Sequence, residues 1–102
     1  MKIQRIRTYQ LGCKLTQPFS FSQWSYSTRA AMLIEIATDE GVTGWGECYG
    51  PAAVCQSAVS DFYAPRLIGA NPLDTEVLWH RMWQASLDFA RGGVMTAAMS
   101  GL

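Results

Sequence analysis

Charged residues are scarce in this chain, and neither sign of charge dominates. Of its 102 residues only 16% are charged, and 8 Lys or Arg are balanced by 8 Asp or Glu, so that the formal net charge is zero. Proteins that bind nucleic acid or an anionic membrane through electrostatics carry an excess of positive charge. We therefore expect neither nucleic acid nor a membrane among the partners of this chain.

Long hydrophobic runs are absent as well. The longest unbroken apolar stretch is Ala30 to Ile34, far below the roughly 20 residues that a membrane-spanning helix needs. Residues 1–7 interleave charged and apolar side chains, which is typical of a folded element and not of a secretion signal. These features predict a cytoplasmic protein.

Cysteine and histidine are also few. The cysteines Cys13, Cys48 and Cys55 form no Cys-x-x-Cys pair, which argues against a zinc site and a disulfide scaffold and favours buried free thiols. The single histidine, His80, has no serine or cysteine that can be assigned to it as a nucleophile. We assign no catalytic residue and no metal ligand in this chain.

The pattern of apolar residues changes near Gly50. Before that residue, alternating side chains predict strands at 2–12, 29–38 and 42–49, with a hairpin turn at Gly41 between the last two. In the first strand the apolar spacing slips from two to three, which predicts a bulge or a change of face.

After Gly50, apolar residues recur at helical spacing. One helix is predicted at about 52–63, ended by Pro65, because proline cannot donate the next backbone hydrogen bond. A second helix begins at Asn71, as an N-cap before Pro72, and a third begins at Val94. The patterns predict one α+β domain over residues 1–102, with a three-stranded antiparallel meander at about 2–49 and a helical segment at about 52–102.

Residues 15–28, between the first two predicted strands, are expected to form a long loop. The segment contains Phe19, Phe21, Trp24 and Tyr26, and these rings supply the apolar area that a disordered segment lacks. The rings either cap the local core or face a ligand, and the residues alone leave both interpretations open.

The third predicted strand carries two further signals. Gly44 and Gly46 lie one pleat apart, which predicts that another backbone or a ring packs closely against them. Glu47 precedes the bend at residues 48–51. It either hydrogen-bonds the loop backbone and supports its shape or takes part in chemistry directly, and the pattern favours support.

The last helical pattern runs to Leu102 without a stop signal, which favours a chain truncated within a longer polypeptide. At this point the sequence resembles a known family. The resemblance is carried by Pro18-Phe19, Arg29, Met32 to Gly41, Gly44 to Glu47, Pro65 to Gly69, Asn71 to Asp74 and Thr96 to Leu102. These residues are similar to the N-terminal capping domain of the enolase superfamily, in its mandelate racemase/muconate lactonizing enzyme branch. Gly44 to Ala52 looks most like the acid-sugar dehydratases and lactone cycloisomerases.

The resemblance implies a two-domain enzyme, in which this domain covers the mouth of a C-terminal (β/α) barrel. In such enzymes Mg²⁺ held by barrel carboxylates stabilises an enediolate while a barrel Lys or His removes the proton α to a carboxylate. The implied partners are the barrel, a small carboxylate substrate and further copies in a homo-oligomer. The 102-residue chain alone is not expected to be active.

The resemblance also implies that two loops of the cap close over the substrate and exclude water. Their substrate-binding residues map to Phe19, Phe21, Trp24, Tyr26, Tyr49 and Val54. The alternative is a free-standing α+β module that binds a ligand or a protein through its aromatic segment and has no chemistry of its own. A coding frame that continues past Leu102 into a barrel would distinguish the two interpretations.

Overall fold

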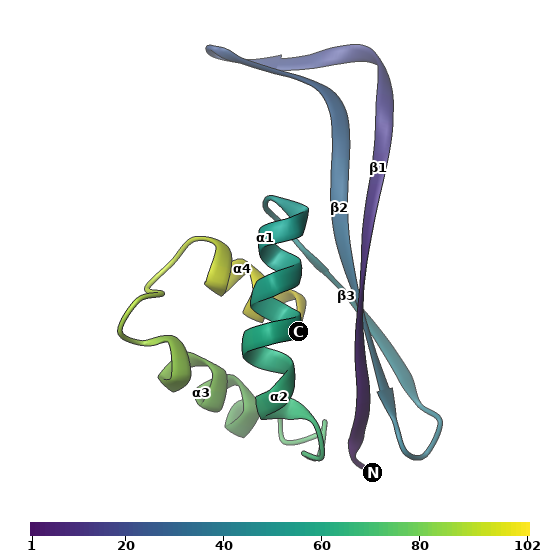
Figure 1. Cartoon of the computed structure of the whole chain (residues 1–102), viewed down its shortest axis with the longest axis vertical. Coiled ribbons are helices and arrows are strands. Elements are labelled where there is room, and N and C mark those ends of the chain that lie inside the picture. The colour runs from purple at the N-terminus through teal and green to yellow at the C-terminus, as the bar shows by residue number, and fades with distance from the viewer.

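The computed structural model describes residues 1–102 and consists of one antiparallel sheet with helices packed against it (Figure 1). The strands are β1 (Ile3–Phe21), β2 (Trp24–Thr38) and β3 (Thr43–Cys48), in the spatial order β1-β2-β3. The helices are α1 (Ala52–Ser57), the π-helical η1 (Ala58–Tyr63), α2 (Ala64–Leu67), α3 (Thr75–Ser86) and α4 (Val94–Gly101). The predicted α+β class and three-stranded meander are confirmed.

The body of the sheet packs one face against the helices. Met32 and Ile34 of β2 are fully buried, and Thr8 of β1 accepts a hydrogen bond from Gln56 of α1. The alternate residues, including Glu35, lie on the opposite, outer face of the sheet. The ladder shifts register between Ile3 and Arg5, which confirms the predicted irregularity in the first strand.

Residues 15–28 form a hairpin arm and not the predicted loop. The β1–β2 ladder continues to the pair Phe21↔Trp24, and the chain turns at Ser22 and Gln23. Cross-strand aromatic pairs stabilise antiparallel ladders, and the pairing of Phe19 with Tyr26 adds a second such pair. A register shift between Lys14 and Phe19 interrupts the ladder, and Figure 1 shows the arm bending toward the side on which the helices lie.

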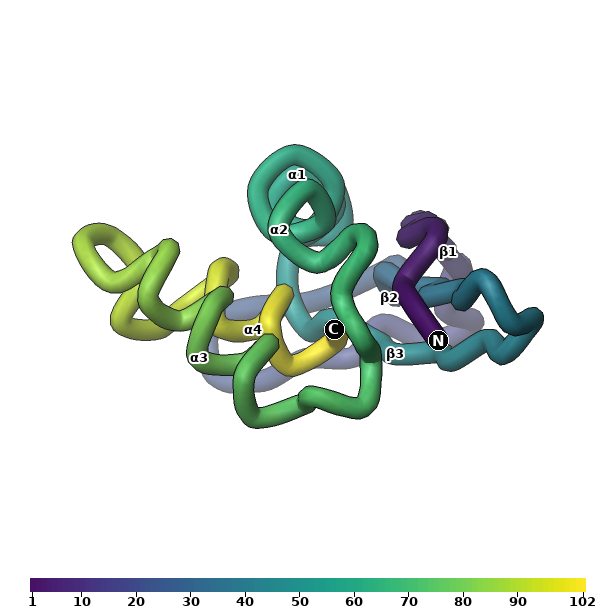
Figure 2. The backbone as a smooth tube through the Cα atoms, turned by 90° about the horizontal axis from the view of Figure 1, so that it is seen from below, coloured from purple at the N-terminus to yellow at the C-terminus, as the bar shows by residue number.

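The helix after Gly50 is longer than predicted, because Pro65 does not end it. Helix α1 passes through η1 into α2, which ends at Leu67. In η1 the hydrogen bonds are of the π type, with the Ala64 N–H bonded to the Val59 carbonyl. This wider turn precedes Pro65, and such a turn relieves the clash and the missing donor that make proline unfavourable in a regular α-helix. Figure 2 shows this helix end-on, with the N-terminus and α3 on opposite sides of it.

The expected N-cap at Asn71 is also wrong. The Asn71 side chain accepts a hydrogen bond from the Leu73 backbone N–H at 3.1 Å, which closes a local turn in place of a helix start. Helix α3 therefore begins at Thr75, after Asp74. The third helical pattern is confirmed, because α4 begins at Val94.

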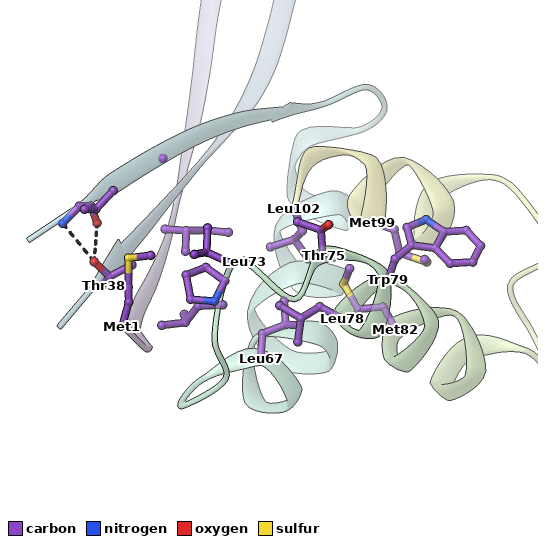
Figure 3. A pocket seen from close by; sticks show the side chains of 15 residues that line it. Met1, Thr38, Leu67, Leu73, Thr75, Leu78, Trp79, Met82, Met99 and Leu102 are labelled. Atoms are coloured by element: carbon purple, nitrogen blue, oxygen red, sulfur yellow. Dashed lines mark hydrogen bonds between the residues drawn. The ribbon is translucent and has the colours of Figure 1, made fainter. Parts of the chain in front are cut away.

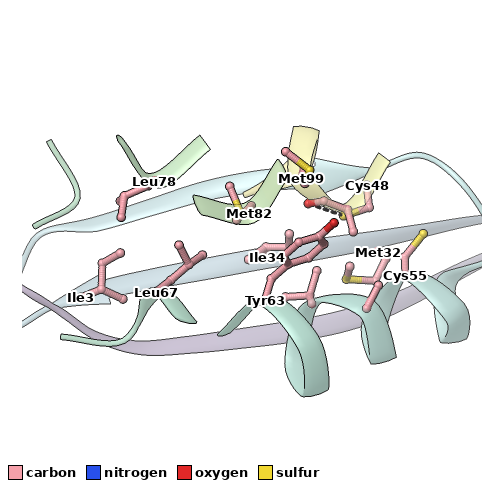
Figure 4. Packing of buried hydrophobic residues seen from close by; sticks show 13 residues of the cluster. Ile3, Met32, Ile34, Cys48, Cys55, Tyr63, Leu67, Leu78, Met82 and Met99 are labelled. Atoms are coloured by element: carbon pink, nitrogen blue, oxygen red, sulfur yellow. Dashed lines mark hydrogen bonds between the residues drawn. The ribbon is translucent and has the colours of Figure 1, made fainter. Parts of the chain in front are cut away.

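The core lies between the sheet and the helices (Figure 4). Its largest fully buried side chain is Tyr63 of η1, whose hydroxyl donates a hydrogen bond to the Met95 carbonyl at 3.3 Å. Cys48 and Cys55 are buried free thiols as predicted, whereas Cys13 is exposed, because it belongs to the outer face of the sheet.

Helix α4 crosses β3 at two glycines. A Cβ atom built on Gly46 would lie 1.9 Å from the Gly101 carbonyl oxygen, so the predicted close approach is confirmed at Gly46. Gly44 has no heavy atom within 4 Å of a built Cβ, and the prediction is wrong there. None of the helices is both long and apolar enough to span a bilayer.

Candidate ligand-binding groove

Four aromatic rings share one face of the hairpin arm. Phe19 pairs with Tyr26, and Phe21 pairs with Trp24, so all four side chains project from the same side of the ladder. Phe21 stacks on Tyr26 with a centroid distance of 5.8 Å, and Trp24 meets Tyr26 edge-on at 6.5 Å. The rings are between 40% and 62% exposed. They pack on one another and do not cap the core. The interpretation of this segment as a cap of the local core is therefore wrong.

Arg29 lies where the arm joins the body of the domain, paired with Cys13 across the ladder, and its guanidinium reaches one of these rings. Its guanidinium carbon lies 4.8 Å from the centroid of the Phe19 ring, within the range of a cation–π contact. No acidic side chain forms an ion pair with Arg29. The guanidinium is therefore held by a ring face while the N–H groups at its edge have no protein acceptor.

A groove of about 520 Å³ lies between the base of the arm and the bend that joins β3 to α1. Such a volume is within the roughly 300–1,000 Å³ range of small-molecule pockets. The bend is possible because Gly50 has a φ of 146°, which side chains other than glycine rarely adopt. The groove is lined by Tyr26, Thr28, Arg29, Ala30, Glu47, Cys48, Tyr49, Gly50, Pro51 and Ala52.

The polar lining of this groove carries both signs of charge. Arg29 and Glu47 line it together but form no ion pair with each other. The hydroxyl groups of Tyr26, Thr28 and Tyr49 complete the set, and Tyr49 is 86% exposed. A cation, an anion and three hydroxyls provide donors and acceptors for a small ligand that itself carries charge and hydroxyl groups.

The structure brings only some of the predicted site residues together. Tyr26 and Tyr49 line the groove, and the other three rings of the arm share the face of Tyr26. Val54 lies elsewhere, in a separate apolar hollow with Phe62 and Phe89. Glu47 lines the groove, but its side chain makes no hydrogen bond to the bend, so its supporting role stays a prediction.

Arg29 was missed as a site residue, although the sequence contained a signal for it. It is the single Lys or Arg between residues 15 and 65, and it follows directly on the aromatic segment. An isolated cation beside clustered aromatic residues is a typical setting for a cation–π contact. The sequence could therefore suggest a contact between Arg29 and an aromatic ring. It could not place Arg29 at the groove, because that position depends on the bend of the arm.

A second, apolar pocket of about 380 Å³ lies at the other end of the sheet (Figure 3). Figure 3 shows Met1 and Thr38 on one side of it, facing Leu78, Trp79 and Met82 of α3. No charged side chain lines this pocket. Its hydroxyl and amino groups are those of Thr38, Thr75 and Met1, and the amino group of Met1 is already paired with Glu40, so the polar groove remains the candidate site. No group of three or more His, Cys, Asp or Glu side chains in the chain is arranged to hold a metal ion.

Comparison with known proteins identifies the family. A sequence model described as the mandelate racemase / muconate lactonizing enzyme N-terminal domain matches residues 4–102. The chain belongs to this family. The match covers nearly the whole chain, and the resemblance found in the sequence is thereby confirmed.

Two relatives of this family member are sugar-acid enzymes. The chain is 39% identical over 102 residues to a D-galactarolactone cycloisomerase from Agrobacterium fabrum and 33% identical over 105 residues to a D-galactonate dehydratase from Variovorax paradoxus. Both alignments cover 100% of this chain but only 27% and 22% of the relatives. The mandelate racemase/muconate lactonizing enzyme domain described here therefore spans about a quarter of the length of these relatives.

Solved structures share its fold. The 3,6-anhydro-D-galactonate cycloisomerase from Zobellia galactanivorans matches 99% of this chain with a TM-score of 0.85 and 40% identity, over 26% of its own length. A racemase from Streptomyces coelicolor, whose structure contains bound magnesium, matches 97% of this chain with a TM-score of 0.90 and 25% identity, over 29% of its own length. The fold of this family's N-terminal domain is thus confirmed for the chain.

Proposed function

We propose that this chain is the N-terminal capping and specificity domain of an enzyme that removes the proton α to the carboxylate of an acid sugar or a related acid. The reaction completed by that enzyme is a dehydration, a cycloisomerisation or a racemisation. The observation that carries the proposal is the groove between the aromatic arm and the β3–α1 bend. Support comes from the cycloisomerase and dehydratase activities of relatives that this chain matches over its whole length.

In this proposal the arm and the bend shape the substrate pocket. The four rings of the arm offer apolar walls to the C–H faces of a sugar chain, whereas Arg29, Glu47 and the hydroxyl groups offer hydrogen bonds. Closure of such walls over a reacting centre excludes water and strengthens the polar contacts inside. Phe19, Phe21, Trp24, Tyr26 and Tyr49 are the residues proposed to contact substrate, and Glu47 is proposed to support the bend. A substrate contact of Val54 stays a prediction, because this residue lines a separate hollow.

The reacting groups are proposed to belong to a C-terminal barrel domain, which is also the first partner of this chain. The residues of the cap do not fit a magnesium site, because no three acidic side chains converge in it. Magnesium, when bound by barrel carboxylates, supplies stabilisation of the negative charge that develops as the α proton leaves. A cytoplasmic homo-oligomer is the proposed state of the full-length enzyme.

The test is a screen of the full-length protein with Mg²⁺ against hexonic and hexaric acids and their lactones, followed by NMR of the products. We expect turnover of at least one acid, with exchange of the α proton for solvent deuterium. Loss of turnover on chelation would support the proposed magnesium. No turnover of any acid, together with binding of an acid by the 102-residue chain alone, would favour the free-standing binding module instead.

A further inference from the structure

We propose that Arg29 selects substrates with a second acidic group, so that dicarboxylic sugar acids are preferred over monocarboxylic ones. In this inference the guanidinium pairs with the carboxylate at the end remote from the carbon that loses its proton. The inference rests on the proposed function and goes beyond it in naming the class of substrate and the residue that selects it.

The first argument is the state of the Arg29 side chain. The face of its guanidinium is occupied by the Phe19 ring at 4.8 Å, whereas its N–H groups form no ion pair and no side-chain hydrogen bond within the chain. A guanidinium presents its donors in a planar fork that matches a carboxylate in a bidentate geometry. The contact with Phe19 leaves that fork free.

The second argument is that Arg29 combines a ring contact, an unpaired guanidinium edge and a place in the groove, which no other arginine of the chain does. Arg5 is paired with Glu35 at 3.0 Å. Arg66 also lies over a ring, that of Phe62, but it donates a hydrogen bond to the Phe62 carbonyl. Arg81 donates a hydrogen bond to the Arg66 carbonyl at 3.1 Å. Each of these three guanidinium groups has an acceptor inside the domain, and Arg29 has none. Arg7 and Arg91 also form no ion pair and no side-chain hydrogen bond, but neither lies over an aromatic ring or lines the groove.

The third argument is the packing of aromatic rings beneath Arg29. Phe19 packs against Phe21 at 6.3 Å, and Phe21 stacks on Tyr26, which lines the groove. A charged group held on packed rings loses little conformational freedom when it binds, which favours affinity for its ligand.

The fourth argument concerns the other charge in the groove. Glu47 lines the same groove as the single acidic side chain there. A carboxylate of the ligand is repelled by Glu47 and attracted by Arg29, whereas a hydroxyl group can donate to Glu47. The groove therefore fixes the orientation of a ligand that carries a carboxylate at its end and hydroxyl groups along its chain.

The experiment compares full-length wild-type enzyme with Arg29→Met, which keeps an apolar stem and removes the charge, and Arg29→Lys, which keeps the charge without the fork. The matched control is Arg66→Met, which removes an arginine from another phenylalanine ring. The values of kcat/KM are measured for a hexaric acid and for the hexonic acid of the same configuration. Melting temperatures show whether each variant folds.

We expect the wild type to prefer the hexaric acid. Arg29→Met lowers kcat/KM for it by roughly 10- to 100-fold, the effect of losing a hydrogen-bonded charge pair. The same variant lowers kcat/KM for the hexonic acid much less, because that acid has no second carboxylate to pair with the guanidinium. Arg29→Lys recovers part of the loss, and Arg66→Met leaves the ratio between the two acids at its wild-type value.

The inference is overturned if Arg29→Met and Arg29→Lys lower kcat/KM equally for the hexaric and the hexonic acid. A residue that only holds the arm in place or contacts another domain would affect every substrate alike. Unchanged values, or a wild type that prefers the hexonic acid, also overturn it. In these cases the enzyme is active and the proposed function stands. A wild type that converts no acid contradicts the proposed function. Calorimetric titration with the hexaric acid then tests Arg29 by itself, and equal binding by wild type and Arg29→Met overturns the inference.

Discussion

Glu35 connects two side chains of β1 on the outer face of the sheet. Its carboxylate accepts a hydrogen bond from the Tyr9 hydroxyl at 2.5 Å and another from the Arg5 guanidinium at 3.0 Å. The hydrogen bond from Tyr9, and after it that from Arg5, lowers the pKa of Glu35 below its ordinary value of 4.5. Both partners favour the ionised form of the carboxyl group.

This shift predicts how Glu35 contributes to stability as pH changes. A lowered pKa in the folded state stabilises the fold fully above the unfolded pKa, and the contribution is lost as pH falls through the folded pKa. We expect Glu35→Gln to have a lower melting temperature than wild type at pH 7. The difference between the two melting temperatures narrows below about pH 4.5. Thermal melts between pH 3 and pH 7 measure it. Asp88→Asn, an exposed control outside any ion pair, should show no such narrowing, and a constant difference for Glu35→Gln would contradict the prediction.

The three thiols differ in their surroundings. Burial raises the pKa of Cys48 to about 11 and also raises the pKa of Cys55, whereas Cys13 is exposed. Because the thiolate is the reactive form, we expect iodoacetamide at pH 8 to alkylate Cys13 in the folded protein and to reach Cys48 and Cys55 only after denaturation. Peptide mass spectrometry resolves the three sites. Alkylation of Cys48 as fast as that of Cys13 would show that α4 opens readily from β3.

At the scale of elements, the contact between β3 and α4 depends on an absent side chain. A methyl group at Gly46 would overlap the Gly101 carbonyl, whereas one at Gly44 meets nothing within 4 Å. We expect Gly46→Ala to lower the free energy of unfolding by about 3 kcal/mol or more, the upper range for overpacking, and Gly44→Ala to have little effect. Denaturant unfolding of the two variants measures the difference. Equal stabilities would mean that α4 moves away from β3 at little cost.

Most elements follow from local patterns, and the exceptions have physical reasons. The strand over 29–38 and the turn at Gly41 could be read from alternation and turn chemistry, because both signals lie within a few residues. The hairpin arm could not be predicted in this way, because the pairing of Phe19 with Tyr26 depends on the register across the turn, which the sequence does not give. The continuation of the helix through Pro65 depends on the π-type hydrogen bonds before it, for which the sequence gives no periodic signal.

The same distinction holds for the candidate site. The aromatic residues of the arm were evident as residue types, and Tyr49 followed from its place at the bend. That Tyr26, Arg29 and Tyr49 share one groove, whereas Val54 faces another hollow, is set by the bend of the arm and by the direction of α1. These are tertiary features, and the spacing of residues within a short segment does not predict which distant segments meet.

At the scale of the whole molecule, the proposed division of labour predicts what the arm does in the full-length enzyme. Trp24→Ala removes an exposed ring of the arm, so we expect a raised KM or a wider substrate range, with magnesium affinity unchanged. Steady-state kinetics on a panel of acids and calorimetric titration with Mg²⁺ measure the two effects. Trp45→Ala is the matched control, since Trp45 is 63% exposed against 62% for Trp24 but lies on the outer face of the sheet. Loss of magnesium binding in Trp24→Ala would contradict this division.

The hairpin arm stands outside the core, and its two limbs pair with each other on either side of the register shift between Lys14 and Phe19. Matched residue pairs can therefore be added to or removed from its two limbs without disturbing the buried cluster. The number of added residues matters, because side chains alternate between faces. Adding one residue to each limb would turn the distal rings to the opposite face of the arm, whereas adding two would return them to their present face. The length of the arm can thus change independently of the sheet and helices that carry it.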